Sequence, residues 1–257
     1  MATVLSGAMT SVPARLRTGR IHSVETCGAV DGPGLRYVVF TQGCLLRCRY
    51  CHNPDTWALQ EGRVETVENL MRDIESYIPF MQFSGGGVTV TGGEPLLQPD
   101  FVAGLFEECH KRGIHTALDS NGFQLPEKAM PVLEHTDLVL LDLKQLNPKR
   151  HRALTSVDHT RILSFARLLS DLEIPMWIRY VVVPGWSDAP EDVELLADFV
   201  STLNGVEKVE LLPYHLMGKN KWEVMGLPYT LEGVEPPTQE VMERIRRQLT
   251  NRGLKVG

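Results

Sequence analysis

The sequence predicts an α/β protein built as a partial (βα)6 barrel, related to the TIM barrel. Short apolar and β-branched runs alternate with stretches of helical periodicity along the chain. The apolar runs are continuous, which is typical of parallel strands buried on both faces. We count six strand candidates, whereas a closed TIM barrel has about eight. A wound open sheet would give the same alternation.

The six strand candidates set the frame for the rest of the chain. They are residues 36–42, 88–92, 115–120, 138–143, 177–183 and 209–214. In barrels and sheets of this class, ligands bind beyond the carboxyl ends of the strands. The segments that follow these strands are therefore where chemistry is expected.

Helices are expected in the intervals between the strands. Thr66 is suited to cap a helix that continues to about residue 78, because its hydroxyl can accept from the first free N–H groups. A second helix is expected over residues 100–113, with Asp100 as its N-cap and Gly113 at its end. The remaining helices are expected near residues 159–172, 190–203 and 238–252.

The composition is that of an ordinary globular protein and argues against two classes of partner. The 257 residues carry 26 Lys or Arg against 32 Asp or Glu, a formal net charge of -6. A nucleic-acid-binding protein needs a basic surface to neutralise phosphates, so no nucleic-acid partner is expected. No apolar run reaches the roughly 18 residues of a membrane span, so no membrane partner is expected. We expect a cytoplasmic monomer.

Residues 1–18 are expected to be a disordered extension, followed by a single domain over residues 19–257. The first twenty residues contain three arginines, several small or hydroxylic residues and no acid. That composition also occurs in organelle transit peptides, so targeting to an organelle is the alternative.

Five cysteines indicate reduced thiols rather than disulfides. The number is odd, and Cys44, Cys48 and Cys51 form a C-x3-C-x2-C array, a crowding typical of a metal site. Cys109 falls on the apolar stripe of the 100–113 helix, so we interpret it as a small buried side chain. Cys27 lies seventeen residues upstream of the array.

Three neighbouring thiolates without a fourth suggest a group with an open coordination position. In a closed zinc site the fourth ligand here would be His52, and all four would lie within nine residues and crosslink little. A structural zinc module stays the alternative. A 4Fe–4S cluster fits better, because three cysteines would hold three irons and leave the fourth iron free for a small molecule.

Polar residues end nearly every predicted strand. The second strand runs into "TGGEP", the third ends in "LDSNG", the fourth in "LDLK" and the sixth in "PYH", while the fifth contains Arg179. Together they indicate one ligand site at the carboxyl ends of the strands. Taken singly, each has a simpler interpretation, because acids cap turns, glycines form turns, and lysine or histidine often faces solvent.

These motifs resemble a known family. The cysteine array with Tyr50 before its last cysteine, followed by "GGEP" on a later strand, resembles the radical S-adenosylmethionine enzymes. Over about residues 19–255 the chain is similar to the glycyl-radical-enzyme activases of that family. The stretches that carry the likeness are "GRIHSVETCGAVDGPGLRYVVFTQGC", "CRYCHNPDTW", "SGGGVTVTGGEP", "LDLKQLN", "WIRYVVVPGWSD" and "ELLPYHLMGKNKW". No cysteine stands between Cys51 and Cys109, where many activases insert a ferredoxin-like domain, and this favours the pyruvate formate-lyase type.

The resemblance implies a set of ligands. Cys44, Cys48 and Cys51 would hold a 4Fe–4S cluster whose free iron binds the amino and carboxylate groups of S-adenosylmethionine. The residues implied to contact S-adenosylmethionine are Tyr50, Cys51, His52, Gly92, Gly93, Glu94, Asp119, Asp142, Leu143, Lys144 and His215. A monovalent cation, Na⁺ or K⁺, beside the acids is a further candidate.

The resemblance also implies a reaction and its partners. Reductive cleavage of S-adenosylmethionine would give a 5′-deoxyadenosyl radical, which takes the Cα hydrogen of a glycine in pyruvate formate-lyase. A flavodoxin or ferredoxin would supply the electron. Because the glycine belongs to a folded enzyme, we expect a splayed barrel that is open at one side. An activase of a different glycyl radical enzyme is the alternative.

Two residues are implied to bind the substrate peptide. Asp31, in "DGPG", would accept backbone N–H groups, although this stretch can also be a plain turn. Arg179 would contact the peptide, and a buried structural arginine is equally consistent with its place inside a strand. Trp186 and Trp222 are interpreted as packing residues.

Overall fold

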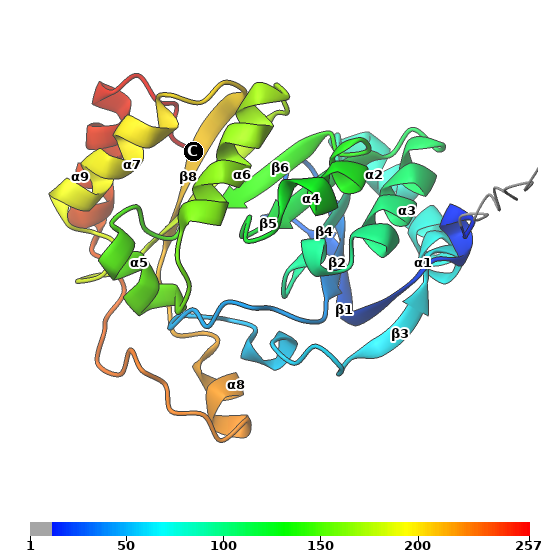
Figure 1. The fold of residues 1–257 in the computed structure, drawn as a ribbon, viewed down its shortest axis with the longest axis horizontal. Coiled ribbons are helices and arrows are strands. Elements are labelled where there is room, and N and C mark those ends of the chain that lie inside the picture. The colour runs from blue at the N-terminus through cyan, green and yellow to red at the C-terminus, as the bar shows by residue number, and fades with distance from the viewer. Residues whose placement is uncertain (1–11) are drawn as a thin grey trace, which may run out of the picture.

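The chain folds around one open, eight-stranded sheet in this computed structural model, which describes residues 12–257 (Figure 1). The order of the strands is β3-β1-β2-β4-β5-β6-β7-β8. The six strands from β2 to β8 pair in parallel, and β1 and β3 add an antiparallel edge. The strands are β1 Thr18–Gly28, β2 Arg36–Thr41, β3 Arg63–Thr66, β4 Gly87–Gly92, β5 His115–Ser120, β6 Leu138–Asp142, β7 Met176–Val182 and β8 Val206–Pro213.

The six expected strands are the six parallel ones, and the expectation of an open barrel is confirmed. The two antiparallel strands were not predicted. In β1 the pairing with β2 shifts register between Ile21 and Ser23 and again between Glu25 and Gly28, so the strand lacks a simple alternation of apolar and polar residues. β3 has four residues, all at least partly exposed, and so gives no hydrophobic signal.

Helices connect the parallel strands and cover the sheet. They are α1 Val67–Ile74, α2 Ile78–Ser84, α3 Pro99–His110, α4 Pro126–Leu133, α5 Pro148–Thr155, α6 Thr160–Asp171, α7 Pro190–Val200, α8 Lys219–Val224 and α9 Gln239–Asn251. In Figure 1, α1 to α4 gather at one end of the sheet and α7 and α9 at the other. The segment after β2 and α8 lie together below the sheet.

The helix signals were correct at Thr66 and wrong at Asp100. The Thr66 hydroxyl accepts from the N–H of Asn69 at 3.1 Å, which is the expected cap of α1. α3 begins instead at Pro99, because proline suits the first position of a helix, and Asp100 lies in its first turn. Helices α2, α4, α5 and α8 were not predicted, since each is short and buries few side chains.

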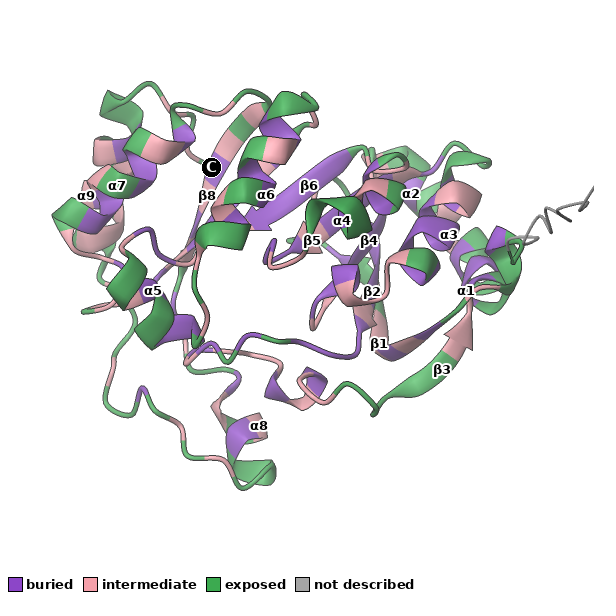
Figure 2. Ribbon diagram, viewed as in Figure 1, coloured by how far each residue is buried: buried purple, intermediate pink, exposed green. Residues whose placement is uncertain are grey.

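Buried side chains fill both faces of the sheet (Figure 2). Val139 and Leu141 of β6 belong to the main core, whereas Leu138 and Leu140 pack with Ala117 and Trp177 on the opposite face. Cys109 is fully buried in the main core, and its interpretation as a small buried residue is confirmed.

The alternation of faces positions the polar residues of the site. Residues two apart in a strand share a face. Asp119 therefore shares the face of Ala117, and Asp142 that of Leu140, one step nearer the carboxyl ends of their strands. Asp142 pairs in register with Arg179 of β7. The carboxylates and the guanidinium meet on one face because the strands are parallel and in register.

Part of the predicted extension is ordered. Residues 14–16 form a short 3-10 helix, and Arg17 donates to the carbonyl of Asp100 at 3.2 Å. Ala14 packs so closely on α3 that a Cβ at Gly104 would lie 3.0 Å from its carbonyl oxygen. The ordered part of the chain thus begins before Gly19. Residues 1–11, where the rest of the predicted disorder falls, lie outside the described residues.

No helix within residues 12–257 combines the length and the apolar character needed to cross a membrane.

Candidate active site

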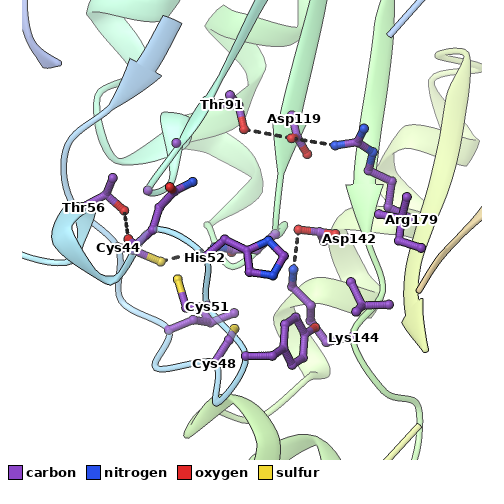
Figure 3. Close-up of a pocket in the computed structure, with 18 of the residues that line it drawn as sticks. Cys44, Cys48, Cys51, His52, Thr56, Thr91, Asp119, Asp142, Lys144 and Arg179 are labelled. Atoms are coloured by element: carbon purple, nitrogen blue, oxygen red, sulfur yellow. Dashed lines mark hydrogen bonds and ion pairs between the residues drawn. The ribbon is translucent and has the colours of Figure 1, made fainter. Parts of the chain in front are cut away.

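A cavity of about 530 Å³ opens at the carboxyl ends of the parallel strands (Figure 3). It is lined by the segment 43–57, here called the cysteine loop, and by residues at the ends of β4 to β8. The lining includes these predicted site residues: Asp31, Cys44, Cys48, Tyr50, Cys51, His52, Gly92, Gly93, Asp119, Asp142, Lys144, Arg179 and His215. The structure therefore brings nearly the whole predicted set around one space.

Glu94 and Leu143 are the two predicted residues that do not line the cavity. The side chain of Leu143 is 1% exposed and lies in the main core. The Glu94 carboxylate is also buried, and it accepts from the Ser120 hydroxyl at 2.8 Å and from the N–H of Asn121 at 2.9 Å. Glu94 therefore supports the end of β5 and the residue after it from inside the protein, and its carboxylate does not face the cavity.

The two glycines of "TGGEP" let the end of β4 pack closely against the end of β2 and the start of the cysteine loop. A Cβ at Gly92 would lie 2.5 Å from the N of Thr41, and one at Gly93 would lie 2.2 Å from the O of Gly43. Gly92 also has φ of +106°, a region that favours glycine. In return the N–H of Glu94 donates to the carbonyl of Gly43 at 2.7 Å. The backbone segments can come this close because neither glycine carries a side chain.

The cysteine loop is held from below by the segment around α8. The Trp222 indole N–H donates to the carbonyl of Cys51 at 2.9 Å, and its ring meets that of Trp57 edge-on at 5.1 Å. Lys221 donates to Asn53 at 2.8 Å. The interpretation of Trp222 as a packing residue was therefore incomplete, because it also fixes the backbone of a predicted ligand.

The three cysteine thiols are the type of ligand that holds iron–sulfur clusters. They lie together in one small cluster with Leu46, yet within residues 12–257 no three Cys, His, Asp or Glu side chains converge as the ligands of one ion would. Burial raises the pKa of Cys44 and Cys48 to about 12, and that of Cys51 to about 11. Such thiols stay protonated near neutral pH unless a metal displaces the proton.

A buried ion-pair network forms the upper wall of the cavity (Figure 3). Asp119 accepts from the Thr91 hydroxyl at 2.8 Å and from the Arg179 guanidinium at 3.1 Å. Arg179 also pairs with Glu210 at 3.2 Å and donates to the carbonyl of Val30. Burial raises the pKa of Asp119 to about 6, although Arg179 acts against it.

Arg179 is thus a buried structural arginine that also lines the cavity. Its bonds join β5, β7 and β8 to the segment that leads into β2. The carbonyl of Asp31 in that segment accepts from the Thr89 hydroxyl at 2.6 Å. Val30, which lines the cavity, is 75% exposed, so the cavity reaches the surface beside it.

Lys144 and Tyr50 form the lower wall. The ammonium of Lys144 lies 2.5 Å from Asp142 and 5.6 Å from the centre of the Tyr50 ring. Burial lowers the pKa of Lys144, but the negative charge of Asp142 outweighs it, and the pKa is raised overall. The Tyr50 hydroxyl is buried and has no partner in the described structure. It is therefore available to a bound ligand.

His52 of the cysteine loop and His215, which follows β8, lie against each other in the site. Their rings stack with centroids 4.1 Å apart and planes 25° apart, although 163 residues separate them in sequence. Burial lowers the pKa of His52, which favours the neutral form of its ring. Two stacked rings at the rim give a flat surface of the kind on which an aromatic base can pack.

The sequence of this chain matches the family model described as the radical SAM superfamily over residues 38–200. It is 52% identical over 240 residues to pyruvate formate-lyase 1-activating enzyme of Escherichia coli strain K12, which covers 93% of this chain and 98% of that protein. The chain belongs to the radical SAM superfamily, among its pyruvate formate-lyase activating enzymes.

Other relatives agree with this assignment. Pyruvate formate-lyase-activating enzyme of Staphylococcus epidermidis is 49% identical to this activase over 242 residues, 91% of this chain and 96% of that protein. A domain of pyruvate-formate lyase-activating enzyme from Bacteroides vulgatus superposes with a TM-score of 0.58 at 30% identity, covering 67% of this chain and 98% of that one. Streptococcus suis SuiB shares the fold at 18% identity, with a TM-score of 0.64, over 85% of this chain and 46% of that one. The predicted family and fold are confirmed.

Asn121 is a site residue that the sequence analysis did not assign. Its side-chain N–H group points at the Cys44 sulfur, 3.8 Å away, and its side-chain oxygen accepts from the N–H of Phe123 at 2.9 Å. The second bond fixes the orientation of the amide. The sequence offered one signal, the "SN" that ends the third predicted strand, but nothing local shows that it faces Cys44, 77 residues away.

Replacing Asn121 by leucine is expected to lower the reduction potential of the cluster that the radical SAM family carries. Hydrogen bonds to ligand sulfurs stabilise the reduced, more negative form of a cluster. Asn121→Asp should lower the potential further, because it replaces the N–H donor with a negative charge. An EPR-monitored redox titration measures both shifts. Equal potentials in all three proteins would contradict this role.

Glu94 is expected to make stability depend on pH. Burial raises its pKa from 4.5 to about 7. Since the folded state then binds the proton more tightly than the unfolded state, the contribution of Glu94 to stability is fully present below about pH 4.5 and is lost as the pH rises through about 7. Glu94→Gln should remove this pH dependence, which amounts to a change in the free energy of unfolding on the order of 2 kcal/mol between pH 5 and 8. Urea unfolding at several pH values tests it, and an unchanged slope would refute it.

Proposed function

We propose that this activase generates a glycyl radical in pyruvate formate-lyase, using a 4Fe–4S cluster and S-adenosylmethionine. One observation carries the proposal. Three thiols, two of them buried and one half-buried, share one cavity with the glycine backbone of β4, two acids and a lysine, and this cavity opens to the surface at Val30. A protein substrate needs that opening, and a cluster with three cysteine ligands keeps one iron for a small molecule.

The cysteine loop holds the cluster in this proposal. Cys44, Cys48 and Cys51 supply the thiolates, and the bonds from the Trp222 indole and the Glu94 N–H keep the loop in place before anything binds. Together the bound groups supply a one-electron reductive cleavage of the sulfonium and a carbon radical that takes the glycine hydrogen. The chain orients the reactants and limits the access of water.

The cavity walls bind S-adenosylmethionine by complementary charge and shape. The Gly92–Gly93 backbone can approach the amino group closely because no side chain intervenes. Lys144 faces the carboxylate, and Asp142 holds its ammonium in place. The stacked His52 and His215 rings offer a surface for the adenine, and the unpaired Tyr50 hydroxyl can bond to the ligand.

The rim beside Val30 and Asp31 receives the glycine-bearing peptide. Arg179 fixes this segment by its bond to the Val30 carbonyl, so we assign it a positioning role rather than direct contact with the substrate. The Asp31 side chain lines the cavity and can accept N–H groups of an extended peptide.

Several finer assignments belong to the same proposal. The electron donor is a flavodoxin or ferredoxin, a monovalent cation lies beside Asp119 and Asp142, and the enzyme is a monomer. A cytoplasmic location is supported by the five cysteines, all of which are free thiols, as is usual in a reducing compartment.

The decisive experiment uses the reconstituted enzyme with photoreduced deazaflavin, S-adenosylmethionine and pyruvate formate-lyase. An EPR doublet from a glycyl radical on the substrate enzyme is expected. Cleavage of S-adenosylmethionine without that signal would contradict the proposed substrate and indicate a different glycyl radical enzyme. Absence of any cluster signal would contradict the cofactor assignment.

A further inference from the structure

A group of basic side chains surrounds the outer side of the cysteine loop. Arg47, Arg49, Lys149, Arg152 and Arg161 make up this group, here called the basic patch. Within residues 12–257 none of the five forms an ion pair with a carboxylate. In a chain with a net charge of -6, this is a local excess of positive charge.

Backbone bonds place four of these residues together. The N–H of Arg47 donates to the carbonyl of Thr155 at 2.8 Å, and the N–H of Arg49 donates to that of Leu154 at 3.0 Å. The cysteine loop therefore runs along the last turn of α5. That turn carries Arg152, and Lys149 lies three residues earlier, on the same side of the helix, with both side chains exposed.

The fifth residue reaches the loop through an aromatic ring. The Arg161 guanidinium lies 5.1 Å from the centre of the Phe123 ring, and Phe123 packs against the cluster of Cys44, Leu46 and Cys48. The basic patch thus continues from α5 around the cysteine loop to the start of α6.

Aromatic rings hold the loop arginines without cancelling their charge. Arg47 lies 4.9 Å from the centre of the Trp57 ring, and Arg49 lies 4.8 Å from that of Trp186. A cation held over an aromatic ring stays positive, whereas a carboxylate partner would neutralise it. Trp186 therefore does more than pack, because it keeps Arg49 ordered at the surface.

The patch and the cavity lie on different sides of the same loop. Cys44, Cys48 and Cys51 line the cavity, whereas none of the five patch residues does. The cavity must admit S-adenosylmethionine and a glycine. An electron needs no such entry, and the patch adjoins a predicted cluster ligand, since the Arg47 guanidinium donates to the carbonyl of Cys44 at 2.8 Å.

We propose that the basic patch is the docking surface for an acidic protein that carries a one-electron flavin or iron–sulfur centre. The reduced centre of the donor loses one electron and the cluster gains it, and no atom passes between the two proteins. Complementary charge speeds the encounter and orients it, with an effect that salt weakens. This inference rests on the proposed function, because it assumes a cluster at the cysteine loop.

The test compares two reductants on the same holoenzyme. Lys149→Glu/Arg152→Glu reverses two exposed charges that lie outside the cavity. With reduced flavodoxin at low salt, the variant should acquire the EPR signal of the reduced cluster on the order of tenfold more slowly than the wild type. With photoreduced deazaflavin the two proteins should react at equal rates. Adding salt should narrow the difference seen with flavodoxin.

The matched control is Arg247→Glu/Lys255→Glu, which makes the same change in net charge on residues of α9 and the segment after it. Its rate with flavodoxin should stay near that of the wild type. Equal slowing of both double variants would overturn the proposal, since net charge alone would explain it. Wild-type rates in the Lys149→Glu/Arg152→Glu variant would also overturn it. Glycyl-radical formation with deazaflavin tests the proposed function separately.

Discussion

Cys48→Ala is expected to abolish activation of pyruvate formate-lyase. Cys48 is 8% exposed, lines the cavity and is the central thiol of the array. Its loss leaves two thiols, which cannot hold three irons, so the cluster should be lost or bound far more weakly. The measurement is the EPR doublet of the glycyl radical, together with the iron and sulfide content of the reconstituted protein.

Two other cysteines give matched controls. Cys109→Ala removes a thiol from the main core, and Cys27→Ala removes an exposed one. Both variants should bind iron and sulfide as the wild type does and should form the radical. Loss of the cluster in either control would mean that the array does not by itself supply the ligands. A Cys48→Ala protein with full cluster content would contradict the assignment directly.

Arg179→Met is expected to destabilise the fold by roughly 3–5 kcal/mol, the usual cost of removing one partner from a buried ion pair. Arg179 is 8% exposed, and its loss leaves Asp119 without a cation and frees the carbonyl of Val30. Glu210 keeps its second partner, Lys208, at 2.7 Å. Urea unfolding measures the change. Removing the unpaired acid as well, in Arg179→Met/Asp119→Leu, should recover part of the loss.

The loss of stability in the single variant Arg179→Met should depend on pH. In the wild type, burial raises the pKa of Asp119 from 3.8 to about 6. Without Arg179 this pKa rises further, so the folded variant takes up a proton at higher pH. A raised carboxyl pKa gives stability that is present at low pH and lost as the pH rises through it. The deficit of the variant should therefore be smaller at pH 5 than at pH 8. An equal deficit at both values would mean that packing, not charge, accounts for it.

The local sequence determined the parts of the site that lie close together in the chain. The spacing of Cys44, Cys48 and Cys51 in one loop limits what can bind them, whatever surrounds the loop. The six parallel strands were also predictable, because a strand buried on both faces needs a continuous apolar run. Once strands are parallel, their carboxyl ends share an edge, and Asp119 and Asp142 must approach each other.

The tertiary structure alone decided which way each side chain points and what supports it. Glu94 belongs to a strong motif, yet its carboxylate turns into the protein because Ser120 and Asn121 offer it hydrogen bonds from another strand. Trp222 reaches the cysteine loop across 171 residues of sequence, and His215 meets His52 across 163. Sequence patterns report local periodicity and turn chemistry, whereas these contacts exist only after distant segments have packed.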